Sequence, residues 1–296
     1  MKPSIIIVGC GRMGTALAKT LSDRSWPVIG TSSLHRSSAQ KVADICHAPT
    51  ATDTPWEITS RADVVFLTTP DGMIASVCND IAHHDGFAKE AVVLHCSGVH
   101  ASTILEAAHR NGAWIGSMHP LQSFASVDLS QNPFKGIRVA IEGDARAVSL
   151  TTRIVEELDA MPLNIATLGK PLYHAAAVVA SNFLVTLMGA ALRMIEQAGV
   201  TSTEAFDVLK PLIEGTLANI GKAGVYQALT GPVVRGDLQT IETHILAMEE
   251  TMPDMLPLYR CLIQYTAMMA VEGNRISDDG FSALQKIWVK KAPPIL

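Results

Sequence analysis

The sequence predicts an α/β protein in which a Rossmann-type parallel sheet domain is followed by an all-helical domain. Three observations carry this prediction. A glycine-rich motif follows the first apolar run, short apolar runs alternate with amphipathic stretches up to about residue 168, and only helical patterns follow Lys170. We therefore predict a dinucleotide-binding domain over residues 1–166 and a helical substrate and dimerisation domain over residues 167–296.

Six short runs in the first half are predicted strands. They are apolar throughout instead of alternating, which is typical of parallel strands that helices cover on both faces. The amphipathic stretches between them predict the helices that connect such strands. The runs are SIIIVG, PVIGTS, DVVFLTT, AVVLHCSG, WIGSM and RVAIEG.

The second half contains helical patterns separated by recognisable end signals. Gly199 follows the first pattern as a helix terminator, the TSTE stretch at 201–204 resembles a capping box, and Asp237 is a candidate N-cap. The predicted helices span residues 170–198, 202–221, 237–249, 254–271 and 278–289.

Composition and charge favour a small-molecule partner. The chain has 296 residues, 48% of them hydrophobic, and a formal net charge of −5 without a basic block, so nucleic acid is not an expected partner. Its five cysteines are an odd number and form no CxxC pair, which fits neither a disulfide framework nor a zinc site. We expect a cytoplasmic protein without a bound metal.

One segment, residues 175–192, is uncharged and has the length of a minimal membrane span. Ser181, Asn182 and Thr186 interrupt its apolar character, and the chain has no second such segment. We therefore expect no membrane contact and a helix buried on all sides within a soluble protein. So small a helical domain would have difficulty covering this helix alone, which predicts a homodimer through the helical domain.

The glycine motif predicts a dinucleotide site. In IIIVGCGRMGTALAKTL the spacing of Gly9, Gly11 and Gly14 matches GxGxxG between a strand and a helix. Gly9 is expected to permit the tight turn, Gly11 the approach of the pyrophosphate, and Gly14 the contact between helix and strand. A ligand-free glycine-rich turn is the alternative. The intervening residues Cys10, Arg12 and Met13 are predicted to contact the cofactor as well.

The end of the second predicted strand favours NADP(H) over NAD(H). No acidic residue occurs between Val28 and Gln40, where an NAD site places an acid for the ribose hydroxyls. Ser32, Ser33 and Arg36 instead offer hydroxyl groups and a guanidinium, which suit a 2′-phosphate. The alternative is that Arg36 is an ordinary solvated residue.

Polar residues also follow two later strands, at the sheet edge where ligands lie in open α/β sheets. Thr69 and Pro70 come after the DVVFL run and are predicted to contact the cofactor, while Asp71 is expected to cap the next helix. Ser97 follows the VVLH run and is predicted to donate a hydrogen bond near the nicotinamide or the substrate.

The first long helix carries a polar stripe on an otherwise apolar surface. Its spacing predicts that the stripe points in one direction, as the wall of a cleft whose polar groups find partners there. Contacts to a neighbouring helix or subunit are the alternative. The stripe consists of Lys170, His174, Ser181 and Asn182, of which Lys170 is predicted to bind substrate.

Two further residues are candidates outside that stripe. His119, in GSMHPLQSF, follows a predicted strand and is either a structural residue or an acid/base group beside the cofactor. Arg235, in LTGPVVRGD, could bind a substrate carboxylate or phosphate, or it could pair with Asp237 or a partner chain.

Taken together, GSMHPLQSF, KPLYHAAAVVASNF and LTGPVVRGD resemble a family of largely uncharacterised Rossmann-like proteins assigned as NADP oxidoreductases. The wider resemblance is to the superfamily of 6-phosphogluconate dehydrogenase, ketopantoate reductase, pyrroline-5-carboxylate reductase and prephenate dehydrogenase. It extends over essentially the whole chain, and it implies a Rossmann domain followed by a helical domain that also dimerises.

The resemblance also implies roles for three residues. HAAAVVASNFLVTL is similar to a ketopantoate-reductase helix in which a catalytic lysine precedes an asparagine; His174 takes the lysine's place here and Asn182 is the asparagine. MHPLQSF resembles a segment of prephenate dehydrogenases whose histidine accepts a hydrogen bond from the substrate hydroxyl, a role that would fall to His119.

The leading hypothesis is an NADP(H)-dependent oxidoreductase that moves a hydride to or from a small carbonyl, imine or hydroxy-acid substrate. His119 and His174 are the acid/base candidates, with Asn182 and Ser97 orienting the substrate oxygen. Two alternatives stay open at this point. One is a sensor or scaffold that binds NADP(H) without turnover, and the other is a prephenate- or ketopantoate-type enzyme.

Overall fold

The computed structural model describes residues 1–124 and 129–289, which form two compact units. The first unit is Met1–Asn182 and the second begins at Phe183. The predicted domain boundary after residue 166 marks the change from strands to helices, since the last strand ends at Asn164. By packing, however, the first unit also includes the start of the first long helix, where Lys170 is completely buried.

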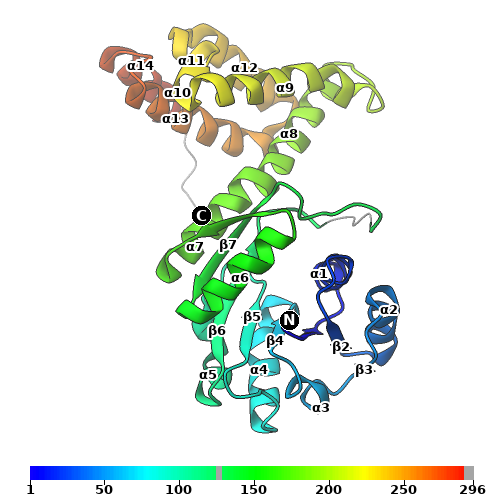
Figure 1. Ribbon diagram of the computed structural model, residues 1–296. Helices are drawn as coiled ribbons and strands as arrows, with labels where there is room; N and C mark the ends of the chain where they lie inside the picture. The colour runs from blue at the N-terminus through cyan, green and yellow to red at the C-terminus, as the bar shows by residue number, and fades with distance from the viewer. Residues whose placement is uncertain (125–128, 290–296) are drawn as a thin grey trace. The chain divides into compact units, whose positions relative to one another are not determined.

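Within the described residues the first unit contains one eight-stranded sheet, in the order β3-β2-β1-β4-β5-β6-β7-β8 (Figure 1). Its first six positions follow the doubly wound order that binds dinucleotides in Rossmann domains. The strands are β1 Ile5–Val8, β2 Val28–Ser32, β3 Ala51–Thr52, β4 Val64–Leu67, β5 Val92–His95, β6 Trp114–Pro120, β7 Arg138–Gly143 and β8 Met161–Asn164.

The six predicted strands all form, and the sheet differs from the prediction in two respects. Strands β3 and β8 were not predicted, because β3 is only two residues long and β8, MPLN, is a short edge strand without an apolar run. Strand β7 is antiparallel to β6, so the sheet is not parallel throughout. In the described part of the connection between β6 and β7 no crossover helix is present, and a parallel return would require one.

Both faces of the sheet are covered by helices, as the apolar strands predicted. Ile5 and Ile7 of β1 belong to a core packed against α1, α2 and α6. Ile6 and Val8 point to the opposite face, into a core with α3, α4 and α5. These helices are α1 Arg12–Asp23, α2 Arg36–Cys46, α3 Trp56–Thr59, α4 Ile74–His83, α5 Glu106–Arg110 and α6 Ala145–Glu157, with short 3₁₀ turns at Asp71–Met73, Ser102–Leu105 and Thr167–Gly169.

The first long helix is interrupted where the two units meet in the sequence. Helix α7 runs over Lys170–Val178, a π-helical turn follows at Val179–Phe183, and α8 continues over Leu184–Gln197. Single π-helical turns within α-helices occur frequently at functional sites. The candidate residues Ser181 and Asn182 both lie in this turn.

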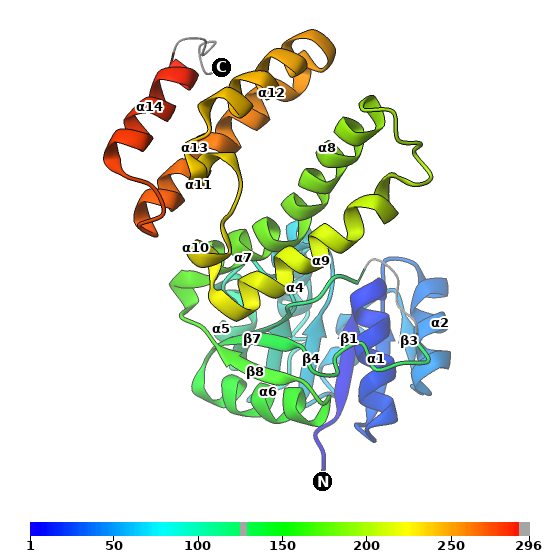
Figure 2. The same cartoon turned by 90° about the horizontal axis from the view of Figure 1, so that it is seen from above.

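The second unit is helical throughout its described residues, as predicted. Helices α8 and α9 lie side by side (Figure 2), and a small core forms around Ile241, Ile245 and Ile263. Asp237 is the predicted N-cap of α12, accepting a hydrogen bond from the Thr240 amide. The further helices are α9 Ala205–Ala223, α10 Val225–Ala228, α11 Pro232–Arg235, α12 Leu238–Thr251, α13 Leu256–Glu272 and α14 Asp278–Val289, with a 3₁₀ turn at Pro253–Met255.

The long apolar helix is not buried on all sides, contrary to the prediction. Thr167–Gln197 is, by length and composition, the one helix among the described residues that could cross a membrane, yet only 6% of its most apolar stretch is buried in the single chain. One such helix is weak evidence for a membrane span. The small helical unit has too few helices to cover this one completely. The prediction of a homodimer rested on the same consideration.

Candidate functional site

The glycine loop between β1 and α1 has the geometry that the motif predicted. Gly9 adopts a φ of +110°, a conformation that side-chain-bearing residues rarely adopt. A Cβ on Gly14 would lie 1.9 Å from the Gly9 carbonyl oxygen, so helix and strand approach as closely as glycine allows. A Cβ on Gly11 would meet nothing within 4 Å, which leaves open space where a pyrophosphate would approach.

A cavity of about 650 Å³ opens at this loop. Most of the predicted cofactor residues line this cavity. Two do not: Arg36 is the exposed first residue of α2, and Ser97 is not among the lining residues. Asp53, Pro55 and Trp56 were not predicted, because they come from the short segment after β3. The predicted residues in the wall are Gly9, Cys10, Gly11, Arg12, Met13, Ser32, Ser33, Thr69 and Pro70.

Two buried hydroxyl groups in this wall fit a bound nucleotide. The Oγ of Ser32 and the Oγ1 of Thr69 are buried without a hydrogen-bond partner among the described residues. Buried polar groups are rarely left unsatisfied, so an unpaired pair beside a glycine loop indicates a polar ligand. Arg12, at the first position of α1, adds a cation to the wall. These groups and the glycine cradle fit a dinucleotide phosphate backbone.

Cys10 contributes packing and not a reactive thiolate. Burial raises the pKa of its thiol to about 12, so the side chain is neutral at physiological pH. Its sulfur donates a weak hydrogen bond to the Ser32 carbonyl oxygen at 3.4 Å. This contact ties the glycine loop to the end of β2.

The two candidate histidines meet at the carboxyl edge of the sheet. The ring centroids of His119, on β6, and His174, on α7, are 6.0 Å apart. Both rings lie against the turn after β5, because a Cβ on Gly98 would be 2.4 Å from the His174 Cδ2 and 2.8 Å from the His119 Nε2. Glycine at position 98 therefore allows both imidazoles to approach one point of the sheet edge.

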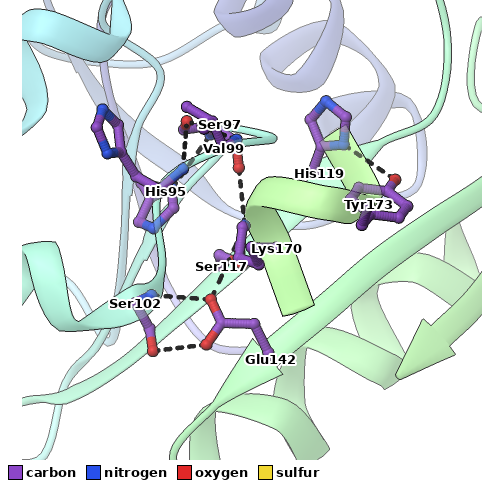
Figure 3. Close-up of polar contacts among 10 residues, drawn as sticks. His95, Ser97, Val99, Ser102, Ser117, His119, Glu142, Lys170 and Tyr173 are labelled. Carbon is purple, nitrogen blue, oxygen red and sulfur yellow. Dashed lines mark hydrogen bonds and ion pairs between the residues drawn. The ribbon is translucent and has the colours of Figure 1, made fainter. Parts of the chain in front are cut away.

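Tyr173 completes this group and was not predicted. Its hydroxyl is 3.0 Å from the Nδ1 of His119, and the two rings pack edge to face (Figure 3). Burial raises the pKa of this tyrosine, so its hydroxyl remains protonated at neutral pH. The sequence carried no separate signal, since the tyrosine directly precedes His174 and would ordinarily point to another side of the helix.

A second cavity, of about 580 Å³, opens beside the histidines. Three members of the predicted polar stripe, His174, Ser181 and Asn182, line it together with His119. The stripe is therefore a cavity wall, as its spacing predicted. The other lining residues are Leu121, Gln122, Ser123, Tyr173, Ala176, Ala177, Val178 and Ala180.

Lys170 does not belong to that wall, so the prediction that it contacts substrate is corrected. Its side chain is 0% exposed. The ammonium donates hydrogen bonds to the Ser97 carbonyl oxygen at 2.8 Å and to the Ser117 Oγ at 2.7 Å (Figure 3). It also lies 3.8 Å from a carboxylate oxygen of Glu142, whose own oxygens accept hydrogen bonds from Ser102.

This buried ammonium influences the neighbouring histidine. Burial lowers the pKa of His119 to about 4, and the positive charge of Lys170 acts in the same direction. Burial also lowers the pKa of Lys170 to about 8, although the Glu142 carboxylate opposes that effect. At neutral pH the site therefore pairs a neutral imidazole at the cavity with a largely protonated amine beneath it.

Ser97 and Arg235 have contacts other than the predicted ones. The Ser97 hydroxyl accepts hydrogen bonds from the amides of Val99 and His100, and its own amide donates to the Nδ1 of His95. Ser97 therefore shapes the turn that carries Gly98. Arg235 lies in the second unit, largely exposed and 3.9 Å from Asp237, which matches the ion-pair alternative.

Comparison with known proteins identifies both parts of the chain. Residues 1–120 match a Rossmann-like domain, and residues 137–266 match a domain of unknown function, DUF2520. The chain therefore contains two successive segments, each similar to one of these domain families. No curated protein sequence matched it.

Solved structures share the fold of this chain over most of its length. TM1727 from Thermotoga maritima is 27% identical with a TM-score of 0.70, over 91% of this chain and 99% of the other. BF3122 from Bacteroides fragilis, assigned as an NADP oxidoreductase, is 24% identical with a TM-score of 0.73, over 90% and 98%. A reductive aminase from Aspergillus terreus, in complex with NADPH and ethyl-5-oxohexanoate, is 18% identical with a TM-score of 0.67, over 97% and 100%.

The two glycines of the loop give a matched pair of variants. Gly14→Ala places a methyl group against backbone and is expected to destabilise the protein by about 1–3 kcal/mol or more, because the contact can be relieved only by moving the loop. Gly11→Ala meets open space, so its melting temperature should stay unchanged while its affinity for NADPH falls. Calorimetry and fluorescence titration separate the two effects; unchanged NADPH affinity in Gly11→Ala would contradict the assigned cradle.

Replacing the buried lysine tests the network of contacts around it. Lys170→Met leaves the Glu142 carboxylate buried beside an apolar group and is expected to cost about 3–5 kcal/mol in free energy of unfolding. The pKa of His119 should rise, because a neighbouring positive charge is removed. Urea unfolding and histidine NMR titration measure these changes.

The surface variant Arg146→Met is the control for that experiment, since it breaks a solvent-exposed pair with Glu90 and should cost below about 1 kcal/mol. Equal losses in Lys170→Met and Arg146→Met would show that the buried pair adds nothing beyond a surface contact.

Proposed function

We propose that this chain is an NADP(H)-dependent oxidoreductase that transfers a hydride between the nicotinamide and a small carbonyl, imine or alcohol carbon. One observation carries the proposal. His119, Tyr173 and His174 meet at the carboxyl edge of the same sheet whose glycine loop forms the dinucleotide cavity. Ligands of open α/β sheets lie along this edge, so acid/base groups and cofactor site are arranged for one reaction.

The names of the similar structures support the chemistry. BF3122 is assigned as an NADP oxidoreductase, the reductive aminase is in complex with NADPH, and a pyrroline carboxylate reductase from Plasmodium falciparum has NADP bound. In this chain Ser32, Ser33 and Arg12 supply hydroxyl groups and a cation in the cofactor cavity. NADP(H) is therefore the proposed cofactor, with Arg36 available near the end of β2 for the 2′-phosphate.

NADP(H) supplies the hydride, and this chain supplies position and a proton. In the reducing direction the protonated Tyr173 hydroxyl and the neutral His119 imidazole form a pair that delivers a proton to the substrate heteroatom. Asn182 and Ser181 line the same cavity and orient that heteroatom by hydrogen bonding. His174, beside the Gly98 turn and in the same cavity, is a second proton carrier.

The two alternatives explain less of the site. A sensor or scaffold accounts for the dinucleotide cavity but gives no role to a neutral histidine hydrogen-bonded to a tyrosine beside a second cavity. A ketopantoate-type site needs a catalytic cation at the cavity, and the lysine of α7 is buried beneath it. We therefore favour an oxidoreductase with a different substrate.

We further propose that the enzyme is a cytoplasmic homodimer through its helical half. Large apolar side chains of α9 are at least half exposed in the single chain, which is an unfavourable surface for a soluble monomer. A second copy of the chain would cover them and the apolar helix before them. The α9 side chains are Phe206, Val208, Leu212 and Leu217. The cysteines are free, as in a reducing compartment.

Turnover is tested by following NADPH oxidation against a panel of ketones, aldehydes and imines. His119→Asn and Tyr173→Phe are expected to lower kcat by about 10²–10⁴-fold if the pair carries the proton, with NADPH affinity unchanged. The exposed cavity residue Ser123 gives a control, because Ser123→Ala should retain activity. Full activity in both His119→Asn and Tyr173→Phe would show that this pair does not transfer the proton.

The same assay has a pH signature. Because the pKa of His119 is lowered to about 4, its neutral form persists as the pH falls and is lost only near that value. Activity should therefore show no half-loss near pH 6.5, where an ordinary histidine protonates. A clear decline centred near pH 6.5 that disappears in His119→Asn would contradict the assignment.

Dimerisation is tested by light scattering on the full chain. Leu212→Glu puts a charge into the exposed apolar face of α9 and is expected to yield monomers. Lys210→Glu, at an exposed polar position on the same helix, is the matched control and should leave the dimer intact. A monomeric parent protein would contradict the proposal.

A further inference from the structure

The cavity beside the two histidines is lined mainly by small aliphatic side chains and by hydroxyl, amide and imidazole groups. Its apolar part consists of small aliphatic side chains such as Ala177 and Val178, and its polar part of neutral hydrogen-bonding groups such as Gln122 and Asn182. Among the residues that the structure describes, no lysine, arginine, aspartate or glutamate lines this cavity. A carboxylate or phosphate group would therefore find no lysine or arginine to pair with in this described wall.

The two residues predicted to bind substrate, Lys170 and Arg235, both have other charged or polar partners. Lys170 is fully buried and donates to the Ser97 carbonyl oxygen and to Ser117, with Glu142 beside it. Its hydrogen-bonding capacity is directed into the sheet and not toward the cavity. Arg235 is exposed in the other unit and lies near Asp237.

His119 cannot take the place of a cation either. Its ring is held between Tyr173, His174 and the Gly98 turn, and Lys170 lies beneath this group. A second positive charge on this imidazole would be repelled by the ammonium and poorly solvated in its half-buried position. The acidic neighbour that acts on His119 is Asp71, whose effect is smaller than that of burial and of Lys170.

We infer that the substrate of this site is an uncharged carbonyl or imine compound with a short apolar substituent, and not a keto acid or a phosphorylated ketone. The inference rests on the proposed oxidoreductase function. A carboxylate that leaves water without an ion-pair partner loses hydration that neutral side chains replace only in part. A carbonyl or imine needs one or two hydrogen bonds, which Tyr173 and Asn182 are placed to supply.

The step then balances without a further reactant. NADPH gives a hydride to the carbonyl or imine carbon, the carbon–heteroatom π bond opens, and the Tyr173–His119 pair gives one proton to the heteroatom. The products are NADP⁺ and a neutral alcohol, or an amine. Solvent restores the proton to the tyrosine and histidine pair.

Isosteric substrate pairs test the charge preference directly. Pyruvamide and pyruvate, and 4-oxopentanamide and 4-oxopentanoate, differ by one formal charge at almost equal size. With NADPH and the full chain at pH 7.5, kcat/KM for each amide should exceed that of its acid by at least about tenfold. Equal or higher values for the acids would overturn the inference while leaving the oxidoreductase function in place.

A cation placed in the wall should reverse the preference. Ala177→Arg introduces a guanidinium at a lining position of α7 and is expected to raise kcat/KM for the acids and lower it for the amides. Ala145→Arg, exposed on α6 of the same unit and outside the lining, is the control and should keep the parent preference. An unchanged preference in Ala177→Arg would count against the cavity as the substrate site.

Failure of the proposed function gives a different result. If neither member of any pair oxidises NADPH, the oxidoreductase proposal is contradicted, and saturation-transfer NMR on the same compounds with NADP⁺ present decides the charge preference alone. Binding of the amides and not of the acids supports the neutral cavity. Binding of the acids, or of neither, overturns it.

Discussion

The candidate site depends on the interaction of the buried Lys170 ammonium with the sheet. Through Ser97, Ser117 and Glu142 this one group contacts the turn after β5 and the strands β6 and β7. It thereby fixes the start of α7 over the carboxyl edge of the sheet. Because Tyr173 and His174 follow within one turn of that helix, their approach to the Gly98 turn depends on where the lysine is anchored.

The buried Lys170 ammonium would destabilise the folded state if it had no partners. A lysine at the first position of a helix meets the positive end of the helix dipole, and complete burial removes its hydration. Glu142 and two oxygen acceptors offset these costs, and Ser102 in turn satisfies the carboxylate. The network is therefore stable only as a unit, which is why replacing a single member is expected to be more damaging than the small number of contacts suggests.

The sequence was sufficient for the fold and the cofactor loop because both follow from local patterns. Gly9 and Gly14 adopt the conformation and the close contact that the motif requires, and the apolar strands have two covered faces. Such patterns could not predict that β7 is antiparallel to β6, because an apolar run does not indicate the direction of a strand in the sheet. Asp53 and Trp56 line the cofactor cavity from the segment that follows β3, a two-residue strand that no periodicity reveals.

The cavity beside the histidines, the candidate substrate site, was predictable only in part, for a physical reason. Helical spacing placed His174, Ser181 and Asn182 in one wall, but it also placed Lys170 there. Spacing gives the direction of a side chain and not its depth, and a lysine one or two turns below the wall can reach inward and be buried. Because that charge is buried, the described wall of the cavity contains no lysine, arginine, aspartate or glutamate. The positive charge still acts, together with the burial of the ring, to lower the pKa of His119. A wall without a lysine or arginine matches the substrate class that we infer, a neutral carbonyl or imine compound that receives a proton from the Tyr173–His119 pair.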